Sequence, residues 1–473
     1  MRPPVETPLA YSLPAELRRV LGADPAFERA WLVGGCVRDA LMGRPALDFD
    51  FEVYGVEYAD LVRALAPFGG TDVVGRAFGV VKLRLADGRE ADFGLPRRDT
   101  RVGPGHRGFE VSFDPSLDPE TAGSRRDFTI NALLWDPRRS VVVDYFGGLR
   151  DLRDRVLRHT GGAFAEDPLR VLRAMQLASR FDFAVAPETV ALSAGIAGAH
   201  AELAPDRIRG EWFKWASRSR KPSAGLRFLA DCGWLEHYPE LSAMRGTPQD
   251  VKWHPEGDVW QHTLHSLDAL VNDPAWREAG EDSRIAWSFA VLLHDTGKPS
   301  QTRRESRGGV ERIVSPGHEA AGVPPSRAFL ARIGAPAWTA EHVAPLVAQH
   351  MAHLQAATER AVRRLAKRLE PETITALATI IRADTAGRPP LPPGPPESLA
   401  TMLRIAEELS LAHEPPRALL LGRHLLERSW APGPGLGAKL AEAFEAQLDG
   451  EFADLEGALR WLDAHPEPPG HSR

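Results

Sequence analysis

Residues 31–53, WLVGGCVRDALMGRPALDFDFEV, decide how the N-terminal part of the chain folds. The short apolar run Trp31–Val33 predicts a strand, and the pair Gly34-Gly35 ends it. Residues 36–42 have the apolar spacing of a short helix. A second strand is predicted over Asp48–Val53. The order of strand, glycine turn, helix and strand indicates an α/β unit.

Two acidic residues, Asp48 and Asp50, share one side of the second predicted strand. Side chains alternate along a strand, so Phe49 and Phe51 point to the other side and can enter a core. The two carboxylates then lie roughly 7 Å apart. Carboxylates that close raise each other's pKa, and a divalent cation removes the conflict. Because Mg²⁺ prefers oxygen ligands, Asp48 and Asp50 are candidate catalytic residues and magnesium ligands.

The turn before the helix has the properties of a phosphate site. The free N–H groups at Gly34 and Gly35, together with the helix dipole, favour an anion. Arg38 lies about one turn into the helix and can reach the same anion. Asp92, in a strand predicted over residues 90–93, is a candidate third acid. The alternative interpretation of all these residues is a surface hairpin with solvated charges.

The motif Gly-Gly-x-Val-Arg-Asp followed by Asp-x-Asp resembles the head domain of the class II nucleotidyltransferases, which comprise tRNA CCA-adding enzymes and bacterial poly(A) polymerases. Arg126-Asp127-Phe-Thr-Ile-Asn131-Ala-Leu matches that family's second motif. The resemblance implies that Arg126 meets the phosphates of the nucleotide and that Asp127 helps to hold its ribose. It also implies an α/β head, with a small mixed or antiparallel sheet and helices, followed by an all-α neck, body and tail.

The helix predicted over residues 165–181 carries a candidate base-reading pair, Asp167 and Arg170. A carboxylate accepts from the exocyclic amine of cytosine or adenine, and a guanidinium donates to the neighbouring ring nitrogen. Uracil and guanine present the reverse order and would leave charged groups unpaired. Asp167-Pro168 is also a strong helix start, which is the alternative. The resemblance favours base recognition, because Glu-Asp-x-x-Arg is the family's motif, and it adds Arg173 as a nucleotide contact and Arg207 as a buttress.

A second constellation lies further along the chain, with ligand-type residues in the order His…His-Asp…Asp. It resembles the HD metal-dependent phosphohydrolases, and the matching residues are His262, His294, Asp295 and Asp384. Imidazole with carboxylate suits Ni²⁺, Mn²⁺, Fe²⁺ or Zn²⁺ better than Mg²⁺ alone. His318 and His350 match further histidines that hold a second metal or a phosphate. The resemblance implies 2′,3′-cyclic phosphodiesterase, 2′-nucleotidase and phosphatase activities; the alternative is a domain that only packs.

Composition limits the class of protein. The 473 residues carry a net charge of −6, so nucleic-acid binding must use local basic patches such as residues 201–228. The two cysteines, Cys36 and Cys232, lack metal spacing and indicate a reducing compartment. No membrane span or signal peptide is evident, which predicts a cytoplasmic protein. Residues 97–107 (RRDTRVGPGHR) are expected to form a flexible basic loop near the head site.

These observations predict an N-terminal extension (1–27), a catalytic head (28–158), a neck and body for base recognition and tRNA binding (159–248), an HD domain (249–388) and a helical tail (397–473). The expected function is template-independent addition of CCA to the 3′ end of tRNA from CTP and ATP, by a monomer or homodimer that does not bind membranes. One alternative is a CC- or A-adding specialist or a poly(A) polymerase. Another is an HD nucleotide phosphohydrolase with a non-catalytic RNA-docking head.

Overall fold

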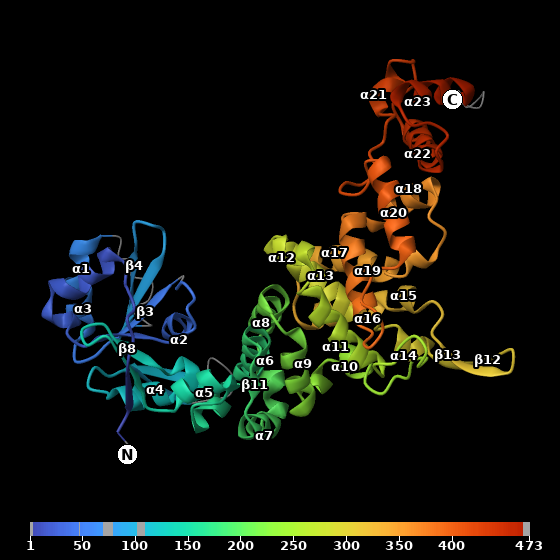
Figure 1. Cartoon of the computed structure of the whole chain (residues 1–473). Coiled ribbons are helices and arrows are strands. Elements are labelled where there is room, and N and C mark those ends of the chain that lie inside the picture. The colour runs from blue at the N-terminus through green and yellow to red at the C-terminus, as the bar shows by residue number, and fades with distance from the viewer. Residues whose placement is uncertain (1–2, 47, 70–78, 102–108, 467–473) are drawn as a thin grey trace. The chain divides into compact units, whose positions relative to one another are not determined.

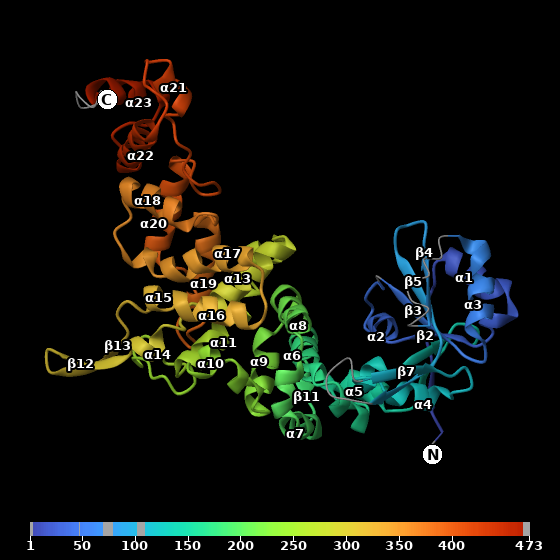
Figure 2. The same ribbon diagram turned by 180° about the vertical axis from the view of Figure 1, so that it is seen from behind.

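The computed structural model describes residues 3–46, 48–69, 79–101 and 109–466 (Figure 1). The chain forms two compact units. The first comprises Met1–Trp215 and Ala224–His237, and the second comprises Ala216–Ser223 and Tyr238–Arg473. In Figure 2, blue to green segments belong mostly to the first unit, and yellow to red segments belong to the second. Within the described residues, no helix is both long and apolar enough to cross a membrane.

A mixed sheet of seven strands forms the centre of the first unit. Strands β3 and β5 are parallel, and every other neighbouring pair is antiparallel. Across the sheet, the order is β1 (Val5–Pro8), β9 (Val141–Asp144), β8 (Leu134–Asp136), β2 (Ala30–Val33), β3 (Phe49–Val53), β5 (Glu90–Gly94) and β4 (Val80–Arg84). The sheet and the helices that follow it confirm the predicted fold class.

The alternation predicted for the acidic strand is present in β3. Phe49 and Phe51 are buried, and the ring of Phe51 stacks on Phe93 with centroids 4.8 Å apart. Asp50 lies between them on the accessible face. The strand begins at Phe49, one residue later than expected, so Asp48 precedes it. The apolar face of β3 therefore fixes the side from which the acids project.

Short helices complete the head. They are α1 (Ala15–Ala23), α2 (Gly35–Leu41), α3 (Tyr58–Leu65), α4 (Pro119–Ser124) and α5 (Gly148–Asp154). Strand β1 pairs with the edge strand β9, so residues 5–8 belong to the sheet of the head rather than to a separate extension. The prediction of a loop at residues 97–107 is wrong for its first part, because β6 (Arg97–Arg101) pairs with β7 (Phe109–Phe113). Its remaining residues lie outside the described part of the chain.

Helices follow the head. They are α6 (Leu169–Phe181), α7 (Pro187–Gly195), α8 (Pro205–Arg218) and α9 (Pro222–Asp231). A two-stranded parallel pair, β10 (Val156–Leu157) and β11 (Ala184–Val185), ties the end of the head to the turn after α6. Helix α6 buries one long face that includes Leu172 and Met175. This packing holds the start of α6 close to the head.

The second unit is built around four helices that pack on one another: α11 (Val259–Leu270), α13 (Glu281–Leu293), α17 (Ala337–Gln349) and α19 (Ile374–Ala386). An antiparallel hairpin, β12 (Arg303–Arg307) with β13 (Val310–Val314), projects from them and was not predicted (Figure 1). Smaller helices surround the four: α10 (Pro239–Ser242), α12 (Pro274–Glu278), α14 (Lys298–Gln301), α15 (His318–Ala321), α16 (Val323–Arg332) and α18 (Glu359–Leu369).

The last helices are α20 (Glu397–Glu408), α21 (Gly422–Leu426), α22 (Pro434–Asp449) and α23 (Leu455–Ala464). Helix α20 follows the proline-rich stretch 388–396 but packs against α18 and α19, which precede it. Residues of α21, α22 and α23 share a small apolar core of their own that includes Leu425, Ala443 and Leu462. The predicted division at residue 397 therefore does not coincide with a break in packing.

Candidate nucleotide and metal sites

The glycine turn, the acidic strand and the second motif of the head converge. Gly34 has a φ of +77°, a conformation that favours glycine. A Cβ atom at this position would lie 3.2 Å from Nη1 of Arg126 and 3.8 Å from Oδ2 of Asp50. The turn thus brings backbone N–H groups, a guanidinium and a carboxylate together, which is the composition that a nucleotide phosphate with a divalent cation requires.

Asp50 has a second acid beside it. In the parallel pairing of β3 with β5, Asp50 lies directly opposite Asp92. Partial burial raises the pKa of Asp50, and the charge of Asp92 raises that pKa further. Burial likewise raises the pKa of Asp92, although Lys82, with Nζ 3.6 Å from Oδ2, opposes the shift. Asp48 is exposed just before the strand. This crowding of carboxylates fits a divalent cation, which would lower the energy of their ionised forms.

A buried carboxylate that the sequence analysis missed holds the arginines of the second motif. Glu52 Oε1 accepts hydrogen bonds of 2.8 Å from both Arg125 and Arg126, and its Oε2 accepts one from the hydroxyl of Tyr54. Burial raises the pKa of Glu52, but the two guanidinium groups outweigh it, and the pKa is lowered. The period of two that identified Asp48 and Asp50 also places Glu52 on their face, so the signal was present in the sequence.

Arg38 is engaged inside the protein. Its side chain is buried, and Nη1 donates to Oδ1 of Asn131 at 2.6 Å. Nε and Nη2 donate to Asp39, and the guanidinium lies 4.6 Å from the ring centroid of Phe181. Arg38 therefore joins α2 to the second motif and to the end of α6. Its Nη2 also lies 3.3 Å from the position of a Cβ on Gly35, directly against the turn.

Asp127 connects the second motif to helix α6. Its Oδ1 accepts from the side-chain amide of Asn131 at 3.0 Å, and its Oδ2 accepts from Nε of Arg173 at 2.9 Å. Burial opposes ionisation of Asp127, but the charge of Arg173 and these hydrogen bonds lower its pKa. Two residues predicted to contact the nucleotide are thus brought together as a pair.

Asp167 and Arg170 do not pair with each other. Asp167 accepts hydrogen bonds of 3.2 and 2.8 Å from the guanidinium of Arg207, and its Oδ1 lies 3.2 Å from the N–H of Leu169 at the helix start. Arg170 donates to the backbone carbonyls of Ala163 and Arg125. The N-cap residue of α6 is Pro168, and not Asp167 as the alternative interpretation expected, but Asp167 still accepts from a backbone N–H at the helix start, and Arg207 buttresses it. Neither contact exhausts the lone pairs of a carboxylate or the five N–H donors of a guanidinium.

A second cluster lies among the central helices of the second unit. Each member stands in, or directly after, a helix that packs on the others: His262 in α11, His294 and Asp295 after α13, His318 at the start of α15, His350 after α17 and Asp384 in α19. All of them are buried except Asp384, which is partly exposed. The residues predicted from the HD-like pattern are therefore together in space.

The ligand-type atoms form two groups that share a carboxylate. In the first, Nε2 of His262 lies 3.0 Å from Oδ1 of Asp384 and 3.4 Å from Nε2 of His294. In the second, Nε2 of His318 lies 3.2 Å from Nε2 of His350. Asp295 faces both groups, with Oδ2 3.2 Å from His294 and Oδ1 3.3 Å from His318. Each group could hold a cation, and Asp295 would be able to contribute to either one.

Hydrogen bonding orients the histidines for metal binding. Nδ1 of His294, His318 and His350 each lies 2.7 Å from a backbone carbonyl oxygen, which can only accept, so Nδ1 carries the proton. In a neutral ring, Nε2 is then unprotonated and offers a lone pair. Two such nitrogens facing each other at 3.2 Å, as in His318 and His350, require a shared cation or an additional proton between them. Burial, together with the charge of His294, lowers the pKa of His350 to about 3. Burial opposes protonation of His318, but its hydrogen bond to Asp295 and the charge of Asp295 outweigh burial and raise its pKa, so a shared cation or a proton on His318 each satisfies the pair.

Two supporting residues, Glu256 and Lys298, were not predicted from the sequence. Glu256 accepts from Nδ1 of His262 at 2.8 Å and from Nδ1 of His254 at 2.9 Å. These hydrogen bonds outweigh burial and lower the pKa of Glu256 to about 2. Lys298, in the run His-Asp-Thr-Gly-Lys, places Nζ 2.7 Å from Asp295 Oδ2. Carboxylate–histidine pairs of this kind fix the ring of a metal ligand.

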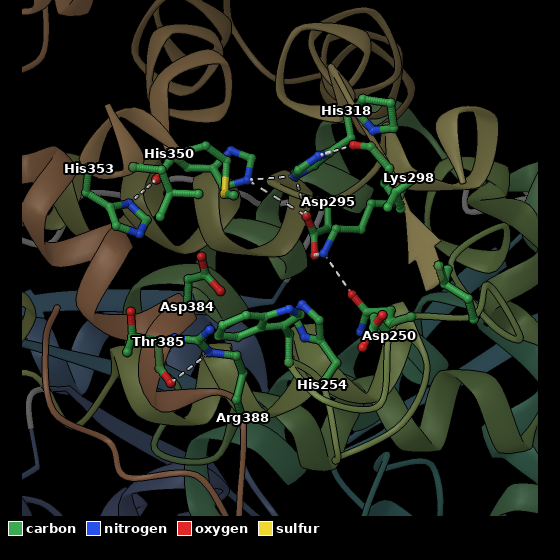
Figure 3. Close-up of a pocket in the computed structure, with 18 residues that line it drawn as sticks. Asp250, His254, Asp295, Lys298, His318, His350, His353, Asp384, Thr385 and Arg388 are labelled. Carbon is green, nitrogen blue, oxygen red and sulfur yellow. Dashed lines mark hydrogen bonds and ion pairs between the residues drawn. The ribbon is translucent and has the colours of Figure 1, made fainter. Parts of the chain in front are cut away.

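A cavity of about 480 Å³ opens onto the second group and Asp384. Figure 3 shows His318, His350 and Asp295 on one side of it, with His254 and Arg388 across from them. Gly297 allows the close approach of α14 and α15, because a Cβ there would overlap the carbonyl oxygen of His318 and lie 2.6 Å from the nitrogen of Gly322. The cavity is large enough for a small substrate to reach the cluster.

Known proteins match the chain over most of its length. The family described as poly A polymerase head domain matches residues 30–158. The multifunctional CCA protein of Xanthomonas campestris pv. campestris (strain B100) is 37% identical over 436 residues, which cover 88% of this chain and 97% of that protein. The multifunctional CCA protein of Stenotrophomonas maltophilia (strain K279a) is 36% identical over 427 residues, with 88% and 98% covered.

Solved structures share the fold. The Bacillus stearothermophilus CCA-adding enzyme in complex with CTP aligns with a TM-score of 0.64 at 20% identity, over 96% of this chain and 98% of that one. The Thermotoga maritima CCA-adding enzyme complexed with tRNA aligns with a TM-score of 0.59 at 19% identity, over 98% and 100%. The identity to the curated relatives, over nearly their whole length, shows that the chain is a nucleotidyltransferase belonging to the family of multifunctional CCA proteins.

Proposed function

We propose that this protein adds C, C and A to the 3′ end of tRNA, using CTP and ATP and no template. The convergence of the Gly34 turn, Asp50 and Arg126 carries the proposal. Family membership supports it, as does the shared fold with enzymes that were solved with CTP and with tRNA. In the reaction, the oxygen of the terminal 3′-hydroxyl bonds to the α-phosphorus, pyrophosphate leaves, and the hydroxyl proton is lost.

Residues of the head would bind the metal ion and the phosphates of the nucleotide. Asp48 and Asp50 would hold Mg²⁺, which when bound offsets the charge on the phosphates and on the departing pyrophosphate. The N–H groups of Gly34 and Gly35 receive phosphate oxygens, and Arg126, held by Glu52, faces the same place. Arg38 keeps the turn in position from within the protein.

Residues of the second motif and helix α6 hold the sugar and choose the base. Asp127, paired with Arg173, holds the ribose. Asp167 accepts from the exocyclic amine of cytosine or adenine while Arg207 holds it in place, and Arg170 donates to the ring nitrogen through an N–H not used by the carbonyls. UTP and GTP are then rejected, because their carbonyl oxygen would face the carboxylate of Asp167 and their ring N–H would face the guanidinium of Arg170.

Extension of a tRNA that lacks CCA tests this function. Labelled CTP alone should add two residues, and CTP with ATP should add three. Asp50→Asn should abolish incorporation with either nucleotide. With both nucleotides present, a product that gains only C or only A would indicate a CC- or A-adding specialist, and a long A tail would indicate a poly(A) polymerase.

We also propose that the second unit contains an HD-type phosphohydrolase. The facing Nε2 atoms of His318 and His350, with Asp295 beside them, carry this proposal, and the word "multifunctional" in the relatives' names accords with it. His262, His294, Asp295 and Asp384 would hold one ion, with His318 and His350 joining a second ion or a phosphate. Ni²⁺, Mn²⁺, Fe²⁺ and Zn²⁺ all suit these donors, and the bound metal would polarise water and phosphate.

The proposed substrates are 2′,3′-cyclic phosphates, 2′-nucleotides and simple phosphomonoesters. For the cyclic ester, the oxygen of water bonds to phosphorus, one P–O bond of the ring breaks, and the proton passes to the released sugar oxygen. His294→Ala with Asp295→Ala should abolish hydrolysis and spare CCA addition. An Asp50→Asn variant that keeps full incorporation would show that the metal ligands are wrongly assigned. A wild-type protein that hydrolyses these esters but incorporates no nucleotide would instead favour a phosphohydrolase whose head only docks RNA.

We infer a cytoplasmic location, because Cys36 and Cys232 are buried free thiols and no disulfide joins them. We also propose that the protein is a monomer or homodimer, and that the head (28–158), the neck and body (159–248) and the HD domain (249–388) divide as predicted. Size-exclusion chromatography with light scattering would measure the oligomeric state directly.

A further inference from the structure

Large apolar side chains are exposed at the mouth of the cavity in the second unit. Trp253 is 53% exposed and Leu354 is 67% exposed, and both line this cavity. Met351 and Ile313 line it as well. Leaving such side chains in water is unfavourable, and their concentration at one opening marks a binding surface.

The interior of the same cavity is arranged for a phosphate. His318, His350 and Asp384 line it, and so do two cations, Lys298 and Arg388. Lys298 already contacts Asp295 and Gln249. Among the described residues, the side chain of Arg388 has one hydrogen bond, 3.3 Å from Nε to the carbonyl oxygen of Thr385. Its remaining N–H groups suit the oxygens of a phosphate ester.

Backbone hydrogen bonds place Trp253 in a turn beside this interior. The backbone N–H groups of Trp253 and His254 both donate to the carbonyl oxygen of Asp250, at 3.0 and 2.9 Å, which forms a tight turn. His254 contacts Glu256, and Glu256 contacts His262. His262 belongs to the metal-type cluster, which comprises the six ligand-type residues His262, His294, Asp295, His318, His350 and Asp384. Lys252 lies 5.0 Å from the indole centroid and adds positive charge at the rim. An aromatic face is therefore built onto the loop that orients a metal-type histidine.

We propose that Trp253 stacks on the base of a nucleotide whose phosphate lies between Arg388 and the metal-type cluster. The substrate class stays that of the proposed phosphohydrolase, a nucleotide that carries a 2′,3′-cyclic or 2′-phosphate. All bases present a π face, and the indole offers one N–H donor only, so the site binds without choosing the base. This inference rests on the proposed phosphohydrolase function and adds the residue that makes it act on nucleotides.

Two cyclic phosphodiesters separate base binding from phosphate chemistry. Adenosine 2′,3′-cyclic phosphate carries a base, and glycerol 1,2-cyclic phosphate has the same five-membered ring without one. With the metal-loaded full chain, Trp253→Ala should lower kcat/KM for the nucleotide roughly 5- to 150-fold, which corresponds to stacking of about 1–3 kcal/mol. The loss should appear in KM, since stacking is equal in ground and transition states. Hydrolysis of the glycerol ester should not change, and Trp253→Phe should keep most of the activity.

Val251→Ala is the matched control, because Val251 is 76% exposed on the same loop and does not line the cavity. Equal losses on both substrates, or a wild-type protein that does not prefer the nucleotide, would overturn the role of Trp253 and leave the phosphohydrolase intact. If the wild-type protein hydrolyses neither ester, the phosphohydrolase proposal fails. Calorimetric titration with adenosine 2′-monophosphate and with inorganic phosphate then decides: equal affinities of wild type and Trp253→Ala for the nucleotide refute stacking, and selective weakening supports it.

Discussion

Replacing Arg207 by glutamine tests how the base is chosen. Arg207 makes two hydrogen bonds to Asp167, at 3.2 and 2.8 Å, and Asp167 is the residue proposed to accept from the amine of CTP and ATP. Glutamine keeps much of the volume and one donor group but removes the charge and the fork. Asp167 would then be free to rotate away from the base. We expect weaker use of the correct nucleotides and poorer rejection of UTP.

The magnitude follows from the exposure of the pair. Hydrogen bonds to charged groups contribute about 1.5–3 kcal/mol when buried, and exposed pairs contribute about 0.2–1 kcal/mol. The two side chains are 28% and 26% exposed, between these limits, so we expect a loss of about 1–2 kcal/mol. This corresponds to a roughly 5- to 30-fold fall in kcat/KM for CTP and ATP.

Single-nucleotide incorporation on a tRNA lacking CCA would measure kcat/KM for CTP, ATP and UTP. UTP has no exocyclic amine that could donate to Asp167, so kcat/KM for UTP should change little. The discrimination of CTP and ATP against UTP should then fall by the same factor as kcat/KM for CTP and ATP. Asp206→Asn, at an exposed neighbouring position on α8, is the control. Equal losses with all three nucleotides would refute the reasoning, because they would show that Arg207 supports the fold and not the reading of the base.

Three further predictions concern single positions. Asp50→Asn should abolish nucleotide incorporation without lowering the melting temperature of the metal-free protein, because the pKa of Asp50 is raised and its charge is therefore unfavourable in the fold; a large fall in melting temperature would contradict this. Glu256→Gln should weaken metal binding in the second unit roughly 10- to 100-fold, measured by competition with a chelating dye, since it orients His262; unchanged affinity would exclude that role. Arg38→Leu should lower the free energy of unfolding by about 3–5 kcal/mol, because it leaves buried polar partners unpaired, whereas the exposed Arg19→Leu should change it little.

The periodicity of residues 31–53 predicted the head well, because burial of Phe49 and Phe51 fixes which side the acids occupy. The same period should have identified Glu52, whose role depends on two arginines about seventy positions away in the chain. The period therefore gives the face on which Glu52 lies, but no local sequence pattern indicates that it pairs with Arg125 and Arg126. Residues 97–101 were misread as a loop because charge hid a strand that gains its stability from pairing with residues 109–113.

The second unit shows the same division. The order His…His-Asp…Asp was enough to predict which residues meet, and the structure brings them within contact. It gave no indication of the hairpin β12–β13, because the first strand, Arg303–Arg307, contains no apolar residue. For Asp167, local propensity and family motif pointed to different roles, and its contacts are compatible with both at once.

The position of His318 in the metal-type cluster depends on the absence of a side chain at Gly297. The backbone of α15, which begins with His318, packs where a methyl group at position 297 would have to be. Any side chain there would push His318 outward while leaving His262, His294 and Asp384 on their own helices. A substitution at position 297 would therefore separate His318 from His350 and Asp295 without replacing any of these residues.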